Sequence, residues 1–227
     1  MCGRYAQYTS APELAGLFDV EMVTPLAEEL SPSWNVSPTQ AVRIIHDTTE
    51  VSVQPTRVLE LAKWGLIPPW AKEESVGARM INARSETVTE KPSFRGPIRH
   101  HRCLIVADGY YEWQAAPAGR RLKTPHYIYR RDNRVLALAG LCSLWRGELL
   151  TCTILTRAAR PEMAHIHDRE PCQVADDAID QWLNPQCQDG EEALGFLAQS
   201  EMAWHVVSTE VNATRNNSPH LLDKVEA

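Results

Sequence analysis

The stretch Cys103-Leu-Ile-Val-Ala107, followed by Asp108-Gly109-Tyr110-Tyr111-Glu112-Trp113, decides the fold of this sequence. Five consecutive apolar residues that lead into an aspartate and a glycine predict a buried strand. Further apolar runs follow at 126–130, 135–143 and 150–156, separated by the turn pairs Asp132-Asn133 and Arg146-Gly147. Strands joined by such short turns pair in antiparallel fashion, so we predict a mainly antiparallel α+β fold.

The flanking sequence adds elements around this centre. Ser10-Ala-Pro-Glu13 has the spacing of a capping box and predicts a helix that ends near Phe18. The prolines at 25, 32 and 38 predict a loop, and Pro68-Pro69 predicts another at 65–70. Further strands are expected at 41–45, 51–53, 58–64, 80–84 and 204–208, and helices at 176–183 and 191–199. Since no repeat or linker divides the chain, we predict one domain over residues 1–227.

Composition and charge exclude several classes of protein. No apolar run approaches the roughly 18 residues of a membrane span, and the N-terminus lacks a secretion signal, which predicts a cytoplasmic protein. The six cysteines form no C-x-x-C pair, which argues against a zinc ribbon or a disulfide framework. Cys103, Cys142 and Cys152 lie in apolar runs and are expected in the core, whereas Cys2 lies in a polar setting.

Basic residues are concentrated in one stretch of this acidic chain. The formal net charge is −6, yet the stretch from Arg79 to Arg102 holds five arginines and one lysine against two glutamates. Arginine has the planar fork that matches a phosphate. The clustering predicts a local anion-binding groove on an acidic body.

Cys2 is the first candidate for chemistry. Without Met1 it would carry an α-amine and a thiol on adjacent carbons, with ordinary pKa values of roughly 7.7–8.0 and about 8.5. An aldehyde that meets this pair can form a Schiff base with the amine, and the thiol can then close a thiazolidine ring. The alternative is that residue 2 is a cysteine by chance, and Cys2 alone does not decide between the two.

Glu112 and Asn82 are the next candidates. Glu112 lies between Tyr111 and Trp113, where loss of hydration should raise its pKa toward neutrality, so that it both gives and takes a proton. Asn82 shortly precedes Arg84, and an amide beside a guanidinium suits a site that orients a sugar or base and holds its phosphate. An outward-facing Glu112 and a turn-forming Asn82 are the alternatives.

The run His165-Ile166-His167-Asp168-Arg169 is the densest polar cluster. One interpretation is a metal site built on the His-x-His pair, but the other histidines are scattered, so we predict no metal. In the other interpretation His167 donates a proton near a leaving oxygen. Asp168 then orients His167, and Arg169 pairs with a phosphate.

Three of the seven tryptophans are candidates for stacking on DNA bases, namely Trp34, Trp70 and Trp113. Trp70 follows two prolines in a predicted loop, and loops run over the surface. Packing therefore explains Trp70 poorly, and we expect it to be exposed and able to stack on a base.

Six motifs, in order along nearly the whole chain, carry a family resemblance. They are Met1-Cys2-Gly3-Arg4, Trp34-Asn35-Val36-Ser37-Pro38, Trp64-Gly65 with Pro68-Pro69-Trp70, Ile81-Asn82-Ala83-Arg84-Ser85-Glu86, Asp108-Gly109-Tyr110-Tyr111-Glu112-Trp113 and Ile166-His167-Asp168-Arg169. With these motifs the sequence resembles the SRAP family, the SOS response-associated peptidase or abasic-site processing family.

The resemblance implies a fold, a reaction and a set of site residues. The fold is a single α+β domain with barrel-like antiparallel sheets, peripheral helices and a positively charged cleft for single-stranded DNA. Cys2 is the nucleophile, exposed after the protein removes Met1 itself, and it traps abasic sites as a thiazolidine cross-link that shields the strand. Completing the active site are Asn82, Glu112 and His167. The implied DNA contacts are Arg4, Arg84 and Arg169 at phosphates and Pro38 and Trp70 against bases, beside the candidate Trp113.

The resemblance also implies an autoproteolytic thiol peptidase-like hydrolase with lyase-type chemistry that needs no cofactor. Its partner would be single-stranded DNA with abasic sites, and we expect a monomer that joins the bacterial nucleoid during repair. Two alternatives stay open. A non-catalytic reader of modified or damaged DNA would not need a terminal Cys2, and a cysteine peptidase acting on other proteins would pair Cys2 with His167.

Two positions depart from the family pattern. Ala71 stands where relatives often carry a second aromatic residue, which predicts a weaker wedge against the bases. Glu170 stands where an apolar or basic residue is usual, which predicts a weaker positive field around Arg169.

Overall fold

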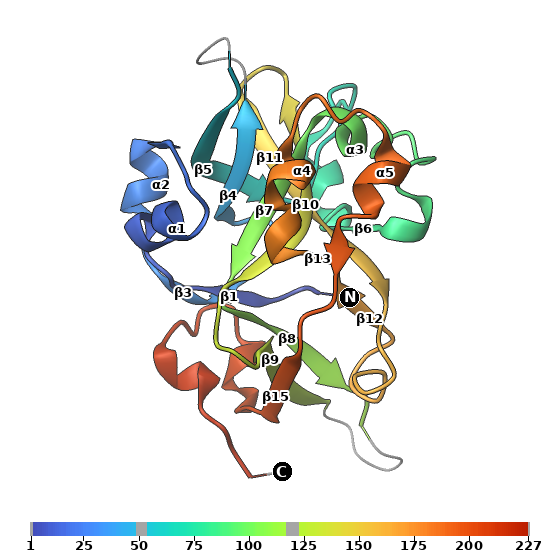
Figure 1. The fold of residues 1–227 in the computed structure, drawn as a ribbon. Helices are drawn as coiled ribbons and strands as arrows, with labels where there is room; N and C mark the ends of the chain where they lie inside the picture. The colour runs from blue at the N-terminus through green and yellow to red at the C-terminus, as the bar shows by residue number, and fades with distance from the viewer. Residues whose placement is uncertain (1, 49–53, 117–122, 227) are drawn as a thin grey trace.

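Two sheets form the frame of the protein in the computed structural model, which describes residues 2–48, 54–116 and 123–226 (Figure 1). The smaller sheet lies below in Figure 1 and contains, in spatial order, β15 (Met202–Val206), β9 (Thr124–Arg130), β8 (Gly109–Gln114), β1 (Tyr5–Gln7) and β3 (Ser33–Val36). All its pairings are antiparallel. The sequence-based prediction of a mainly antiparallel α+β fold is therefore confirmed.

The larger sheet curls into a ring. Its order is β12 (Arg169–Pro171), β11 (Leu149–Ala158), β5 (Thr56–Trp64), β4 (Ala41–Thr48), β7 (Arg102–Ala107), β10 (Leu136–Trp145), β13 (Gln173–Val174) and β14 (Leu197–Ala198). The short strands β2 (Met22–Val23) and β6 (Asn82–Arg84) pair with β5 and β11. Strand β10 also pairs with β11, but β5 and β11 share only the positions Thr151↔Lys63 and Cys152↔Trp64. The ring is therefore not closed as a regular barrel.

Alternating side chains divide the core between the two faces of the ring. On β4, Val42 and Ile44 belong to one buried cluster and Ile45 to another, as the two-residue period of a strand requires. The cluster that contains Ile45 packs beneath the helices that flank the ring in Figure 1. The helices are α1 (Ala11–Leu17), α2 (Pro25–Glu29), α3 (Pro97–His100), α4 (Ile179–Leu183) and α5 (Gly190–Leu194), with 3₁₀ turns at Glu74–Arg79, Ser85–Thr87, Asp176–Ala178, Thr209–Asn212 and Pro219–Leu222.

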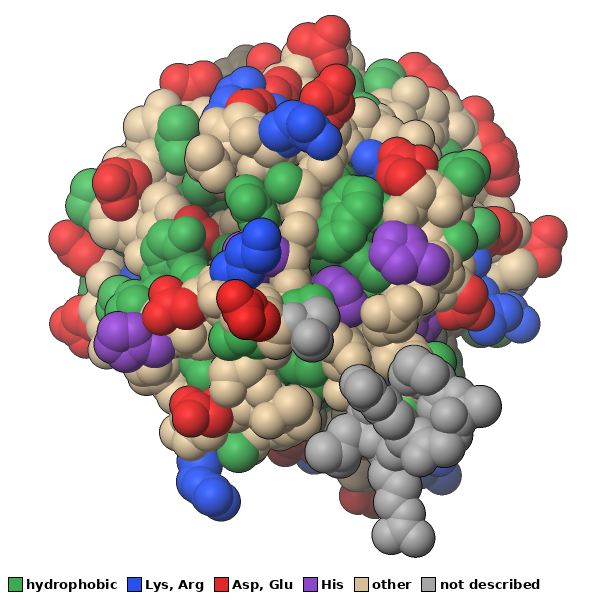
Figure 2. Space-filling model, turned by 90° about the horizontal axis from the view of Figure 1, so that it is seen from below, with side chains coloured by type: hydrophobic (Ala, Val, Ile, Leu, Met, Phe, Trp, Pro, Cys, Tyr) green, Lys and Arg blue, Asp and Glu red, His purple; other side chains and the backbone are tan. Residues whose placement is uncertain are grey.

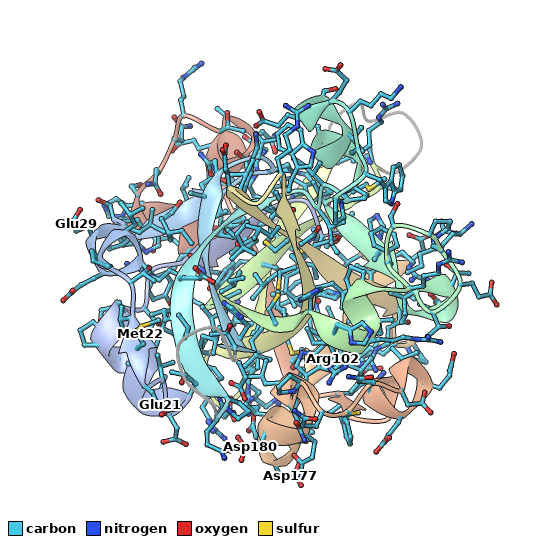
Figure 3. All side chains as sticks on the ribbon, turned by 90° about the horizontal axis from the view of Figure 1, so that it is seen from above. Glu21, Met22, Glu29, Arg102, Asp177 and Asp180 are labelled. Atoms are coloured by element: carbon cyan, nitrogen blue, oxygen red, sulfur yellow. The ribbon has the colours of Figure 1, made fainter. Side chains whose placement is uncertain are left out.

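Arg102 joins the helices to the ring. Its guanidinium donates to the carbonyl oxygens of Asn184, at 2.7 Å, and Ile98, at 2.8 Å, and so connects the segments of α4 and α3 to β7 (Figure 3). The acidic side chains labelled in Figure 3 lie toward the outline of the molecule in that view, at Glu21, Glu29, Asp177 and Asp180. None of the helices in the described part of the chain has the length and apolar character needed to cross a bilayer.

Local predictions differ from the structure at a few elements. The Ser10–Glu13 capping box is present, with both of its hydrogen bonds, at the start of α1. The proline-containing segment predicted as a loop instead contains α2 and β3. The helix predicted at 191–199 ends at Leu194 in the structure. Within the rest of that range, Leu197–Ala198 form β14. The predicted strand at 51–53 lies outside the described residues.

Two glycines close the loop that leads from β5 to β6. Gly65 has a φ of +130°, and a Cβ there would lie 2.5 Å from the carbonyl oxygen of Gly77. The backbone N–H of Leu66 donates to the carbonyl of Met80 at 3.1 Å. Only glycine allows the backbone at these two positions to approach so closely. This close approach returns the chain to β6, which carries Asn82.

Candidate active site

The N-terminal segment is paired on both sides rather than frayed. Strand β1 lies between β3 and β8, where Tyr5 pairs with Val36 on one side and with Tyr110 on the other. The N–H of Tyr111 donates to the carbonyl of Arg4 at 2.9 Å. This pairing carries the start of the chain into the space between the two sheets, where the N-terminus lies in Figure 1.

Cys2 is buried, which contradicts the sequence-based prediction of a polar setting. Its relative exposure is 0%, and it belongs to the same hydrophobic cluster as Tyr5 and Trp64. The prediction is wrong because the double pairing of β1 draws the terminus into the core. Burial, and next the charge of Glu112, raise the pKa of the Cys2 thiol, so the thiol is protonated at neutral pH.

Asn82 holds the backbone of Cys2. Strand β6 runs parallel to β11, with Asn82 opposite Ile154. From this position its Nδ2 donates to the carbonyl oxygen of Cys2 at 2.8 Å. The Oδ1 of Asn82 is buried and has no hydrogen-bond partner within the described chain. An unused acceptor is therefore fixed next to Cys2.

Glu112 is a buried carboxyl on β8. It is 3% exposed, and burial raises its pKa to about 7. A carboxyl with this pKa exchanges its proton readily near neutral pH. Its Oε2 lies 4.0 Å from Nε2 of His167, so the two groups are one short movement or one water molecule away from proton exchange.

His167 ends the loop between β11 and β12. Its Nδ1 receives a hydrogen bond from the backbone N–H of Arg169 at 3.0 Å and also lies 2.9 Å from Oδ1 of Asp168. The N–H can only donate, and the Asp168 side chain is 87% exposed, so the backbone contact is the better guide to the tautomer. Burial lowers the pKa of His167, which favours the neutral ring with its proton on Nε2, toward Glu112.

The four predicted catalytic residues thus come from four separated segments of the chain and meet at one place. The Asn82 hydrogen bond reaches Cys2, the charge of Glu112 acts on the Cys2 thiol, and His167 faces Glu112. Within the described residues, no three side chains of the His, Cys, Asp or Glu type gather so as to hold a metal ion.

Arg4 and Trp113 form a neighbouring unit. The Nη1 of Arg4 donates to Oδ1 of Asn35 and to the carbonyl of Val211, each at 2.7 Å. The guanidinium carbon lies 5.8 Å from the centre of the Trp113 ring, and the Trp113 indole donates to Oδ1 of Asn212 at 2.7 Å. Sequence reasoning assigned no role to Asn35, although it lies inside one of the six motifs.

Arg84 and Arg169 differ in their partners. Arg84 is exposed and forms no ion pair with any described residue. Arg169 binds Glu86 through two hydrogen bonds of 2.6 and 2.9 Å and donates to the carbonyl of Thr156 at 2.7 Å. The hydrogen bonds from Arg169 lower the pKa of Glu86 to about 2. Sequence reasoning missed Glu86, whose signal was its place as an acidic residue inside the basic stretch.

Pro38 and Trp70 are the predicted contacts with bases. Trp70 is 64% exposed, so it lies on the surface as expected. Pro38 is half-buried beside Thr39, whose N–H donates to the carbonyl of Trp64 at 2.8 Å. No contact of the described residues joins Trp70 to Cys2 directly.

Trp34 has a structural partner. Its ring stacks on that of Tyr8, with 6.0 Å between ring centres and 19° between planes. Its carbonyl accepts a hydrogen bond from the Tyr111 hydroxyl at 2.7 Å. These contacts account for the presence of Trp34 through packing within the protein.

Of the two departures from the family pattern, Glu170 forms ion pairs with two arginines. Its side chain is 2% exposed, and it pairs with Nε of Arg157 at 3.0 Å and with Nε of Arg160 at 2.9 Å. The Glu170 carboxylate offsets part of the positive charge of these two arginines, and its effect on the field around Arg169 stays a prediction. At the other position, Ala71 is 7% exposed, and its carbonyl accepts a hydrogen bond from the Trp145 indole at 2.9 Å.

Figure 2 shows the face of the molecule that is seen from below. Several histidine side chains lie among hydrophobic ones near the middle of this face, and many acidic side chains lie toward its outline.

Comparison with known proteins gives consistent matches over most of the chain. Residues 1–214 match the sequence model of the SOS response associated peptidase (SRAP) family. The abasic site processing protein YoaM of Bacillus subtilis (strain 168) is 39% identical over 231 residues, covering 98% of this chain and 98% of the relative. The abasic site processing protein HMCES of Gallus gallus is 33% identical, covering 86% of this chain and 67% of the relative.

The fold also has solved counterparts. A protein from Bacteroides thetaiotaomicron, known from its crystal structure, superposes with a TM-score of 0.84 at 25% sequence identity, covering 99% of this chain and all of the other. A protein from Bordetella bronchiseptica superposes with a TM-score of 0.69 at 27% identity, covering 91% of this chain.

Proposed function

Because the chain belongs to the SRAP family, we propose that it processes abasic sites by trapping them in single-stranded DNA through a covalent thiazolidine cross-link to Cys2. The observation that carries this proposal is the fixed position of Cys2, held by Asn82 beside a carboxyl with a pKa of about 7. An abasic deoxyribose in its ring-opened form is an aldehyde, which is the group that an adjacent amine and thiol capture together.

Maturation comes first. In the intact chain the nitrogen of Cys2 belongs to an amide bond with Met1, and an amide does not form an imine. Hydrolysis of that bond by the protein itself would release methionine and leave a free α-amine on Cys2. The chain would be its own peptidase substrate, and Glu112 is placed to move the proton that this hydrolysis requires.

Trapping then takes two bond-forming steps. The free amine attacks the aldehyde carbon, and loss of water gives an imine. The thiol sulfur adds to the imine carbon, its proton leaves, and the imine nitrogen gains a proton to complete the ring. Because burial keeps the thiol protonated, this second step needs a base nearby, and Glu112 supplies it.

Asn82 and His167 support these steps in different ways. Asn82 fixes the Cys2 carbonyl with its amide nitrogen and offers its unused Oδ1 to a donor such as a sugar hydroxyl. His167, with its proton directed to Nε2 by the backbone of Arg169, can donate to the ring oxygen of the sugar as it opens. Glu112 can return that proton, since the two groups are 4.0 Å apart.

DNA binding would use cations and aromatic rings from several segments of the chain. Arg84 has no competing carboxylate, so it is the clearest phosphate contact, and Arg169 would join it by giving up part of its pairing with Glu86. Trp113 beside Arg4 and the exposed Trp70 can stack on bases. Replacing Arg84 by alanine should weaken strand binding and lower its salt dependence.

A cysteine peptidase acting on other proteins fits the geometry less well. Such enzymes use a thiolate, which a protonated histidine stabilises by lowering the thiol pKa. In this protein the pKa of the Cys2 thiol is raised by burial, and the pKa of His167 is lowered. Both directions oppose a thiolate–imidazolium pair.

The test is a denaturing gel of the purified protein with abasic single-stranded DNA, with and without borohydride. The parent should start at Cys2 by mass spectrometry and give an adduct that survives heat. Cys2→Ser keeps the amine and should give an adduct only when borohydride reduces the imine. A non-removable N-terminal extension should abolish both adducts, and an extended protein that still forms a heat-stable adduct would show that another residue does the chemistry.

A further inference from the structure

Three of the described cysteines gather on one face of the larger sheet. The register of β10 and β11 places Cys142 directly opposite Cys152, and that of β7 and β10 places Cys103 opposite Gly140. Gly140 and Cys142 share a face of β10, since residues two apart on a strand point the same way. All three cysteines belong to the same hydrophobic cluster. The reaction proposed above gives none of them a role.

Gly140 lets the thiol of Cys103 lean toward Cys142. A Cβ at Gly140 would lie only 2.8 Å from Sγ of Cys103, so this sulfur occupies the space that a side chain on β10 would otherwise fill. From there the Cys103 thiol donates a hydrogen bond to the sulfur of Cys142. The pairing of β7 with β10 therefore brings two sulfur atoms together.

Cys142 is the member of this group that reaches a cavity. The cavity has a volume of about 630 Å³ and lies where β4 and β10 end and β11 begins. Cys142 lines it, whereas Cys103 and Cys152 do not. The volume falls in the range of about 300–1,000 Å³ that small-molecule pockets occupy. A small reagent that enters the cavity therefore meets Cys142 before the other two cysteines.

A histidine and a glutamate line the same cavity. His46 on β4 and Glu60 on β5 are hydrogen-bonded to each other. The register of β4 and β7 pairs Ile45 with Leu104, and its continuation by one residue places His46 opposite Cys103. Burial lowers the pKa of His46, but the Glu60 carboxylate outweighs burial, so the net shift is upward. A positive imidazolium is therefore favoured beside the two sulfur atoms.

These surroundings favour the thiolate of Cys142. The hydrogen bond from Cys103 lowers the pKa of the Cys142 thiol, burial opposes this effect, and the charge of His46 adds to it, with a net lowering. Burial raises the pKa of Cys103, which keeps its proton. The thiolate is the form of cysteine that attacks an electrophile. Cys142 is thus the attacking group of the pair, and Cys103 is the thiol in reserve.

We propose that Cys142 and Cys103 form a redox-active pair that small hydroperoxides oxidise through the cavity. The Cys142 sulfur attacks one oxygen of the peroxide and the O–O bond breaks. The other oxygen leaves with the thiol proton as an alcohol, or as water when the reagent is hydrogen peroxide. Cys142 is then a sulfenic acid. The Cys103 sulfur attacks the sulfur of this acid, and the hydroxyl group leaves as water with the Cys103 proton. Two thiols become one disulfide, and the peroxide takes up the two electrons.

This pair is independent of the proposed trapping of abasic sites. None of the four candidate catalytic residues lines the cavity. A Cys103–Cys142 disulfide joins β7 and β10, which already pair along their length, so oxidation should leave the fold intact. The oxidation can be measured without DNA, and its failure would leave the proposed cross-linking by Cys2 untouched.

The test treats the purified protein with hydrogen peroxide or tert-butyl hydroperoxide and follows every cysteine by peptide mass mapping. The parent should form a Cys103–Cys142 disulfide that a dithiol reductant reverses. Cys103→Ala removes the second thiol, so dimedone, which labels sulfenic acids, should label Cys142 in that variant. Cys142→Ala should leave Cys103 as a thiol.

Two other cysteines are internal controls. Cys187 is more exposed than Cys142 but does not line the cavity. Cys142 should be oxidised about three- to tenfold faster than Cys187, since one unit of pKa gives tenfold more thiolate at some loss of nucleophilicity. Cys172 is buried outside the cavity and reports any reaction through unfolding, so it should stay reduced. His46→Gln keeps a hydrogen bond to Glu60 without the charge, and it should slow the oxidation of Cys142.

Oxidation of Cys187 or Cys172 while Cys142 remains a thiol would overturn the proposal. A disulfide of Cys142 with Cys152 in place of Cys103 would overturn it as well. Both results are read from the parent protein alone, so the proposal stays falsifiable even if thermal unfolding shows that a cysteine variant is misfolded.

Discussion

The side-chain amide of Asn82 donates a 2.8 Å hydrogen bond to the carbonyl of Cys2 and so ties β6 to the N-terminal strand. Asn82→Asp keeps the shape but removes the donor, and it places a second carboxyl near Glu112. We expect cross-linking of abasic DNA to slow by about 100-fold, because the reacting groups lose their alignment. Single-turnover gels measure this rate, and strand affinity should stay the same.

The control for this variant is Asn133→Asp, at an exposed turn. It makes the same chemical change away from Cys2 and should cross-link at the parent rate. An Asn82→Asp protein that also cross-links at the parent rate would remove Asn82 from the mechanism.

The raised pKa of Glu112 makes stability depend on pH. Between its ordinary pKa of 4.5 and the folded value of about 7, the folded state binds more protons, so stability falls as the pH rises through this window. Ionised Glu112 then costs the fold about 3 kcal/mol above pH 7. Glu112→Gln should therefore raise the Tm at pH 8 by about 6–12 °C and change it little at pH 4.

Thermal unfolding of both proteins from pH 4 to pH 8 measures this effect. A difference in Tm that does not change with pH would mean that Glu112 titrates normally in the fold. The same variant should cross-link more slowly at every pH, since the amide cannot carry the proton.

Under the proposed function, Glu86 would compete with a DNA phosphate for Arg169. The two hydrogen bonds between them occupy both terminal nitrogens of the guanidinium, which a phosphate would otherwise use. Glu86→Gln removes the competing charge, so we expect tighter binding of unmodified single strands at low salt. The slope of log affinity against log salt should become steeper by about 0.7, the value of one added phosphate contact.

Fluorescence anisotropy over a range of salt concentrations measures both quantities. The side chain of Glu86 is 48% exposed, so water screens the pair, and its loss should change the Tm little. Weaker binding with a shallower slope would show instead that Glu86 presents Arg169 to the strand.

Much of this fold follows from local sequence patterns. The strand at 103–107 and the three strands between residues 124 and 158 are apolar runs bounded by turns, and they form as predicted. The proline-rich segment misled the prediction because Pro25 was interpreted as a loop signal. Proline also fits the first turn of a helix, which is where Pro25 lies in α2.

The parts that could not be predicted depend on partners far away in the chain. Burial of Cys2 results from pairing of β1 with β3 and β8, and no pattern within residues 1–7 shows that pairing. The partners of Arg169 and Glu170 are likewise set by the meeting of separate segments of the chain. The motifs nevertheless named residues that the fold brings together, although only Asn82 lies in a strand predicted from the sequence.

Glu170 provides a test of stability that separates buried from exposed charge. It pairs with Arg157 and Arg160 while 2% exposed, so Glu170→Ala leaves two cations without their carboxylate. We expect a loss of about 3–5 kcal/mol in the free energy of unfolding.

The control is Glu162→Ala, because Glu162 lies 4.0 Å from the same Arg160 but is 58% exposed. That change should cost less than about 1 kcal/mol. Urea unfolding measures both, and strand binding below the unfolding transition should keep the parent salt slope in each variant, since neither charge belongs to the proposed DNA-binding surface. Equal losses in the two variants would mean that burial does not set the strength of the Glu170 cluster.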